Sequence, residues 1–98
     1  MDNKAIIIFN ILKRNYTVDL EIPLDISANE LVVALNSAYD LGIDVSDVKN
    51  CYLKAENPIA LLKGNKQLID YGIRNGTIIN FTEWGFSYAI WISSKNIK

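Results

Sequence analysis

The sequence contains no histidine, a single cysteine, two prolines and no apolar run long enough to cross a bilayer. Histidine is the side chain that most often transfers protons in enzymes, so the sequence lacks the usual residue for general acid-base catalysis. Cys51 has no second cysteine with which to form a disulfide or a zinc site. The C-terminal apolar run is interrupted by Glu83 and serines, short of the roughly 20 residues of a transmembrane helix. A disulfide scaffold, a zinc site and a membrane span are all disfavoured.

The charges are balanced and dispersed along the chain. Ten Lys and Arg residues stand against eleven Asp and Glu residues, which gives a formal net charge of −1. Proteins hold nucleic acid largely through clustered basic side chains, so no nucleic-acid partner is expected. The N-terminal apolar run is broken by Asn10 and has no small-residue cleavage site after it. Because it does not match a secretory signal, a cytoplasmic location is predicted.

The residues that could carry chemistry favour structural roles. Cys51 lies in "NCYLKA", in register with Leu53 on the inward face of a strand, and no neighbouring histidine or Cys-x-x-Cys pattern lowers its pKa. It is expected to be a small buried hydrophobe. A calcium site needs six or more oxygen ligands in an ordered loop, which the spaced carboxylates do not provide; these are Asp19, Glu21, Asp44 and Asp47. No catalytic residue, cofactor or metal ligand is predicted, and an enzyme is not expected.

Two neighbouring segments predict a β-hairpin. Residues 5–12, "AIIIFNIL", are rich in β-branched and aromatic residues and are bounded by the polar "KRN". Residues 16–22, "YTVDLEI", alternate between apolar and polar side chains, which is typical of a strand with one wet face. Its apolar side chains are Tyr16, Val18, Leu20 and Ile22.

An amphipathic helix is predicted over residues 28–41. Ser27 and Glu30 have the spacing of a capping box, and Gly42 is expected to end the helix in the left-handed conformation. The apolar positions repeat at helical spacing and are expected to pack on the hairpin; they are Leu31, Ala34, Leu35, Ala38 and Leu41.

Three shorter strands are predicted after the helix, at residues 51–55, 59–64 and 77–81. Asn75 and Gly76, just before the last of these strands, suit positive backbone φ angles. The order of elements is therefore strand, strand, helix, strand, strand, strand. The sequence shows neither an internal repeat nor a linker, so a single domain is expected. The order of its elements indicates an α+β fold.

That order is the β-grasp arrangement, and two segments make the resemblance specific. "PLDISANELVVAL" resembles the helix entry of ubiquitin, and "NKQLIDYGIRNGTIINF" is similar to the ubiquitin-like segment before the last strand. Within it, Gly72, Ile73, Asn75 and Gly76 resemble the YukD/EsaB family of small ubiquitin-like proteins. The resemblance covers about residues 5–83. It implies a mixed sheet of about five strands packed on one helix, with the last strand in the middle, over a domain of residues 1–84.

The resemblance also implies a function. YukD/EsaB proteins are cytoplasmic accessory components of the type VII, WXG100-exporting secretion machinery of Gram-positive bacteria. A non-enzymatic protein-binding module with secretion-machinery partners is therefore expected. Two alternatives stay open: a ubiquitin-like modifier or carrier that requires C-terminal processing, and a β-grasp interaction domain of an unrelated pathway. Ubiquitin is conjugated through a C-terminal Gly-Gly, whereas this chain ends "SSKNIK" and has no adjacent glycine pair, so a conjugation tag is not expected.

Candidate protein-binding residues occur in two places. In the first strand, Ile6 and Ile8 point outward if Ile7, Phe9 and Ile11 point inward. In the C-terminal aromatic tail, residues 85–98 together with the adjoining Trp84, five large side chains stand out: Trp84, Phe86, Tyr88, Ile90 and Trp91.

The tail has a strand-like alternation over residues 86–92. In the expected fold it follows a strand whose two edges are already paired, so it must pair at an outer edge, cross the open face or add to another chain. Our hypothesis is that it mediates self-association as a homodimer. The alternatives are that it covers Ile6 and Ile8 of its own domain, or contacts a membrane surface.

Overall fold

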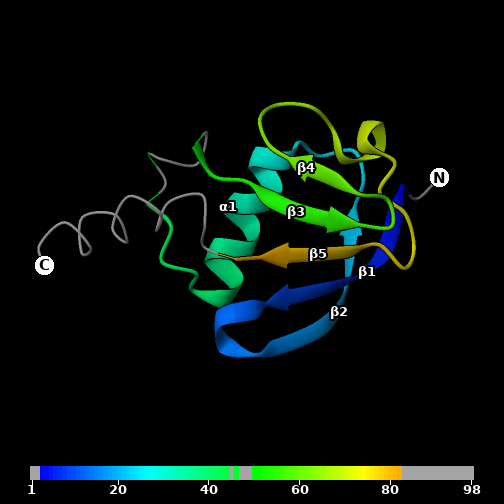
Figure 1. The fold of residues 1–98 in the computed structure, drawn as a ribbon. Coiled ribbons are helices and arrows are strands. Elements are labelled where there is room, and N and C mark those ends of the chain that lie inside the picture. The colour runs from blue at the N-terminus through cyan, green and yellow to red at the C-terminus, as the bar shows by residue number, and fades with distance from the viewer. Residues whose placement is uncertain (1–2, 45, 47–49, 83–98) are drawn as a thin grey trace, which may run out of the picture.

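The computed structural model describes residues 3–44, 46 and 50–82 (Figure 1). These residues form a five-stranded sheet with one α-helix on one of its faces. The bounds are β1 Lys4–Ile11, β2 Tyr16–Pro23, α1 Ala28–Tyr39, β3 Leu53–Glu56, β4 Ala60–Leu62 and β5 Ile78–Phe81. The 3-10 helices η1 Leu12–Arg14 and η3 Leu68–Tyr71 lie in the connections.

The strand order is β2-β1-β5-β3-β4. β1 and β5 are parallel, and the other neighbouring pairs are antiparallel. The last strand is therefore central, with β1 on one side and β3 on the other, which confirms the predicted β-grasp arrangement. The predicted strand-like tail, residues 85–98, lies outside the described residues.

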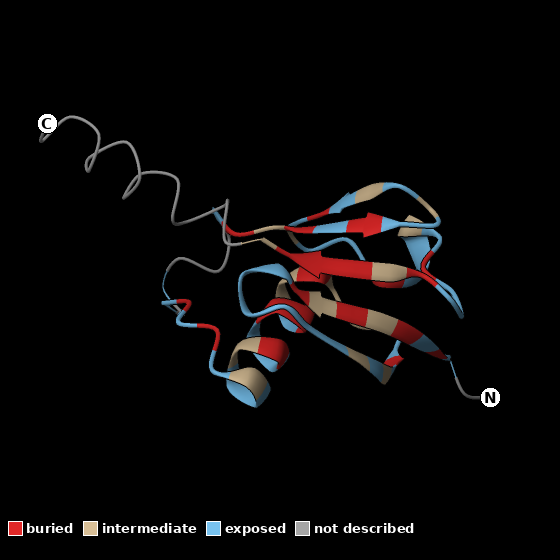
Figure 2. Ribbon diagram, turned by 60° about the horizontal axis from the view of Figure 1, so that its bottom comes forward, coloured by how far each residue is buried: buried red, intermediate tan, exposed pale blue. Residues whose placement is uncertain are grey.

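The core lies between the sheet and α1 (Figure 2). On β1, Ile7, Phe9 and Ile11 are at most 1% exposed, which confirms the predicted inward set. Cys51 and Leu53 are also buried, as predicted. The helix contributes Ala28, Leu31, Val32 and Leu35. Each fully buried large aliphatic side chain stabilises the fold by about 1.5–3 kcal/mol relative to its exposed state, so this layer is the main source of stability.

The start of α1 confirms the predicted capping box. The backbone N–H of Glu30 donates to Ser27 Oγ at 3.0 Å, and the backbone N–H of Ser27 donates to Glu30 Oε1 at 2.8 Å. The predicted apolar stripe is only partly buried, since Ala34 and Ala38 are exposed. The helix is rotated so that Val32 enters the core instead.

The end of α1 differs from the prediction. The helix ends at Tyr39, and Asp40 takes the left-handed conformation with φ 52°. The Arg14 guanidinium donates to the carbonyls of Tyr39 and Asp40 at 2.7 and 2.6 Å. Because these bonds satisfy carbonyls that a helix end leaves unpaired, the helix stops before Gly42. Gly42 also has a positive φ, but it lies beyond the end of the helix.

The turns around the last three strands also differ in detail from the prediction. β3 begins two residues later than expected, and β4 spans only Ala60–Leu62. Asn57, at φ 60°, precedes the cis peptide bond to Pro58 in the turn between them. Gly76 has the expected positive φ, but Asn75 does not. Instead, the backbone N–H of Ile6 donates to Asn75 Oδ1 at 2.7 Å, so the Asn75 side chain extends the pairing of β1.

Candidate protein-binding surface

The sheet face that points away from α1 is called the open face below. Side chains alternate along a strand, so the residues between the core positions project from this face. They are Ile6, Ile8 and Asn10 of β1, Thr17, Asp19 and Glu21 of β2, Ile78 and Asn80 of β5, Lys54 and Glu56 of β3, and Leu61 of β4. Ile6 is 54% exposed and Ile8 is half-buried, so both candidate residues of the first strand point outward.

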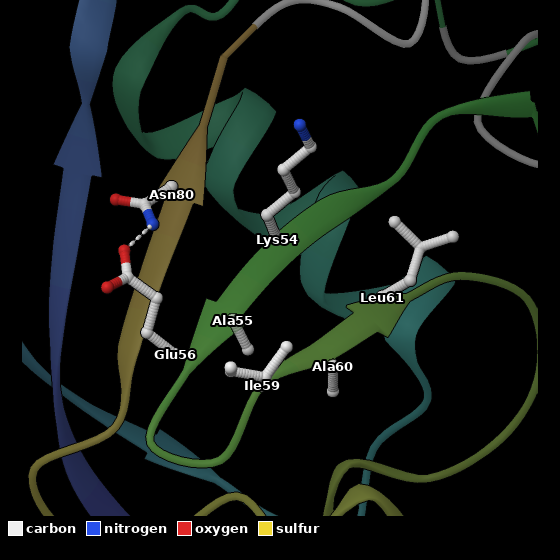
Figure 3. Close-up of a pocket in the computed structure, with 7 residues that line it drawn as sticks. All are labelled: Lys54, Ala55, Glu56, Ile59, Ala60, Leu61 and Asn80. Carbon is white, nitrogen blue, oxygen red and sulfur yellow. Dashed lines mark hydrogen bonds between the residues drawn. The ribbon is translucent and has the colours of Figure 1, made fainter.

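A ladder of polar side chains crosses the open face over four strands. Thr17 Oγ1 donates to Asn10 Oδ1 at 2.8 Å, and Asn10 Nδ2 donates to Asn80 Oδ1 at 2.8 Å. Asn80 Nδ2 then donates to Glu56 Oε2 at 2.7 Å, the bond drawn in Figure 3. A buried amide without partners would be costly, and Asn80 is only 7% exposed. The ladder therefore fixes these polar groups in the middle of the surface.

An apolar pocket lies beside the ladder, over β3 and β4 (Figure 3). Its volume is about 440 Å³, and Asn80 and Glu56 form its polar side. Ile59, which is 91% exposed, and Leu61, which is 52% exposed, are its large apolar side chains. An isoleucine so exposed leaves apolar surface in water, which favours a contact with another molecule.

Sequence reasoning missed Ile59 and Leu61. The run "IALLKG" was interpreted as a strand, but β4 has only three residues, and so short an alternation does not reveal which side chains point out. The asparagine ladder was also missed. Asn10 lies opposite Asn80 because β1 and β5 are parallel neighbours in this register. The pairing can be recognised in the sequence only when that register is known.

The five tail candidates cannot be placed on this surface. Trp84, Phe86, Tyr88, Ile90 and Trp91 lie outside the described residues. Of the candidate binding residues, the structure thus brings together Ile6 and Ile8 on the open face.

Within residues 3–44, 46 and 50–82, no three histidine, cysteine or acidic side chains lie close enough to hold a metal ion. The pKa of Asp44 is lowered, first because the backbone N–H of Ser46 donates to Asp44 Oδ1 at 2.9 Å and then because the Ser46 hydroxyl does so at the same distance. Over the same part of the chain, no helix has both the length and the apolar character to cross a membrane.

The sequence was compared with models of protein families. The model described as "WXG100 protein secretion system (Wss), protein YukD" matches residues 6–80, more than half of the chain. The chain belongs to the YukD family. In this YukD-family protein, the match includes the whole of the ladder and the pocket residues. No curated protein matches the sequence.

Solved structures similar to the YukD-family protein include ubiquitin-like domains. The C-terminal ubiquitin-like domain of mouse tubulin-specific chaperone e has a TM-score of 0.63 at 14% identity, covering 81% of this chain and 84% of that one. The ubiquitin-like domain of tubulin-binding cofactor B has a TM-score of 0.63 at 18% identity, covering 82% and 89%. That of Plasmodium falciparum Dsk2 has 0.52 at 18%, covering 79% and 96%. The fold is therefore a ubiquitin-like β-grasp.

Proposed function

We propose that this YukD-family protein is a non-enzymatic, protein-binding accessory or regulatory component of a type VII, WXG100-exporting secretion system, acting in the cytoplasm of a Gram-positive bacterium. The family match over residues 6–80 carries this proposal. The open face supports it, because exposed apolar side chains stand beside a fixed polar ladder, the combination found in protein interfaces. Its partners are secretion-machinery proteins.

The open face is proposed as the contact with these partners. Ile6 and Leu61 are the apolar side chains to test, because each is about half exposed and neither belongs to the core. A carboxylate at either position would have to be desolvated on binding, which costs affinity without disturbing the fold. Val33→Asp is the matched control, since Val33 is 43% exposed on α1.

The experiment is complementation in the native cell. The gene is deleted, and plasmids supply the wild type, Ile6→Asp, Leu61→Asp or Val33→Asp. We expect WXG100 export to be restored by the wild type and Val33→Asp and strongly reduced with Ile6→Asp and Leu61→Asp, at equal protein levels. Export that does not depend on the gene would contradict the function. Full export with both open-face variants would refute this face as the contact.

The C-terminal tail, residues 85–98, is proposed to mediate self-association as a homodimer. Its aromatic side chains are of the types enriched at interfaces. The alternative is that Trp84, Phe86, Tyr88, Ile90 and Trp91 cover Ile6 and Ile8 of their own domain. Light scattering after size exclusion on the full chain and on a protein lacking residues 85–98 distinguishes them. A dimer that becomes a monomer supports the proposal, and a monomeric mass for both proteins refutes it.

A further inference from the structure

The outer edge of β2 is open to a further strand. Among the described strands, β2 pairs with β1 alone. The N–H of Leu24 donates to the carbonyl of Asn3, which sets the alternation of the antiparallel ladder. Counting back from Leu24, every second residue, which in β2 means Ile22, Leu20, Val18 and Tyr16, therefore bonds toward β1. The backbone N–H and C=O groups of Thr17, Asp19 and Glu21 point outward from the sheet.

An apolar groove runs beside this edge, between β2 and α1. Its volume is about 450 Å³. Its apolar lining includes Leu20, Ile22 and Ile26 on one side and Ala34, Ala38 and Tyr39 on the helix. Ala34 and Ala38 lie one turn apart on the same helix face, and their small side chains leave the space that a larger residue would fill. The groove thus follows the free backbone edge.

Both charged residues of β2 are acidic. Asp19 and Glu21 are exposed and project on the open-face side of β2, and Glu30 lies at the groove on α1. Among the described residues, Glu21 and Glu30 are the only charged ones that line the groove. A strand added to β2 would place alternate side chains in the groove and the others beside Asp19 and Glu21.

We propose that the β2 edge binds an extended segment of a partner protein in which apolar residues alternate with Lys or Arg. The backbone of the segment pairs with Thr17, Asp19 and Glu21, its apolar side chains enter the groove, and its cations face the two carboxylates. This is β-strand addition, in which backbone bonds give affinity and alternate side chains give specificity. The inference rests on the proposed function as a protein-binding module.

Two other occupants fit less well. A second copy paired through β2 would bring Asp19 and Glu21 near their own counterparts, and like charges on facing strands are destabilising. The chain's own residues 86–92 alternate apolar side chains with Ser87, Ala89 and Trp91, so they offer no cation to the carboxylates. A basic partner segment matches both the groove and its acidic side.

The test uses the full chain and a capped synthetic peptide, Val-Lys-Val-Lys-Val-Lys-Val, titrated and followed by amide resonances. We expect the largest shifts at β2 and at the groove side of α1. Each of Asp19→Lys and Glu21→Lys is expected to weaken binding by about 1.4- to 5-fold, from the range of cross-strand charge pairs. Asp70→Lys, an exposed acidic residue on η3, is the matched control and should leave the affinity unchanged.

Two further peptides test the mode of binding. Methylating the backbone nitrogens of one alternate set of peptide residues should abolish binding, whereas methylating the other set should preserve it, because only one set faces β2.

Ala34→Phe, which fills the groove, should also weaken binding at least tenfold.

Equal binding by both methylated peptides, equal binding by a glutamate version of the peptide, or no binding at all would overturn the inference. Shifts confined to the open face would also overturn it. None of these results would affect the complementation experiment. A failure of the proposed binding at β2 can therefore be told apart from a failure of the proposed secretion function.

Discussion

Asn10 and Asn80 lie opposite each other on the parallel strands β1 and β5, and the amide of Asn10 donates to the side-chain oxygen of Asn80 at 2.8 Å. The two residues are 70 positions apart in the sequence. Each also bonds outward, Asn10 to Thr17 and Asn80 to Glu56. The pair therefore joins the two hairpins of the sheet through side chains as well as through the backbone.

Asn80→Ala should destabilise the protein by about 1–3 kcal/mol, because Asn80 is itself largely buried and its loss removes the partner of both Asn10 and Glu56. Urea unfolding measures the loss. Replacing Asn10 and Asn80 together by Val should cost less than the sum of the two single changes, since no amide is then left without its neighbour. Strict additivity of the two changes would contradict an energetically coupled ladder.

Phe9→Ala should cost about 3–5 kcal/mol, because Phe9 is fully buried and its removal leaves a cavity beneath α1. The ring also packs against Tyr39 at 5.4 Å between centroids. Thermal and denaturant unfolding should both show the loss. Leu61→Ala is the comparison, and its half-exposed side chain should cost less than about 1 kcal/mol if the core lies where the structure places it.

Ser27→Ala should lower the free energy of unfolding by about 1 kcal/mol, since the Glu30 N–H loses its acceptor at the first turn of α1. Ser37→Ala provides the control, because Ser37 is exposed in the interior of the same helix. This second change should be neutral or slightly stabilising. Equal losses for both variants would show that the cap contributes nothing specific.

The pKa of Asp44 should lie below 3.8 in the folded protein, because the N–H and hydroxyl of Ser46 favour the charged carboxylate. Its contribution to stability is therefore present above the unfolded-state value and is lost as the pH falls through the folded pKa. Carboxyl carbon resonances measure the titration. Ser46→Ala should raise this pKa only partway, since the backbone bond remains, whereas Ser37→Ala should leave it unchanged.

Sequence patterns correctly predicted the elements that depend on residues close together in the chain. The position of Asn10, taken to point outward, and the Ser27–Glu30 spacing gave the inward face of β1 and the start of α1 correctly. The strand order and the central β5 came from the family resemblance. These features need only periodicity, capping chemistry and a recognised order of elements.

The errors occur where distant residues meet. α1 ends at Tyr39, where Arg14 binds the carbonyls of Tyr39 and Asp40, and a contact across 26 positions has no local signature. Asn75 was expected to have a positive φ, but its side chain pairs with the Ile6 N–H, 69 positions away. Ile59 and Leu61 were missed because their exposure depends on how the short β4 lies against β3. The tail candidates, from Trp84 to Trp91, stay a prediction.

Tyr71 limits how far the β4 edge of the sheet extends. Its hydroxyl donates to the Lys63 carbonyl at 2.7 Å and accepts from the Lys63 N–H at 3.2 Å, just past the end of β4. Asn29 makes two hydrogen bonds to Gly64. The backbone N–H of Asn29 donates to the Gly64 carbonyl, and the Gly64 N–H donates to Asn29 Oδ1. Head-to-tail fibres need two complementary open edges on every molecule. Because the backbone past β4 is bonded within the domain, β4 offers an edge of only three residues to a further strand, so growth of the sheet through both of its edges is disfavoured.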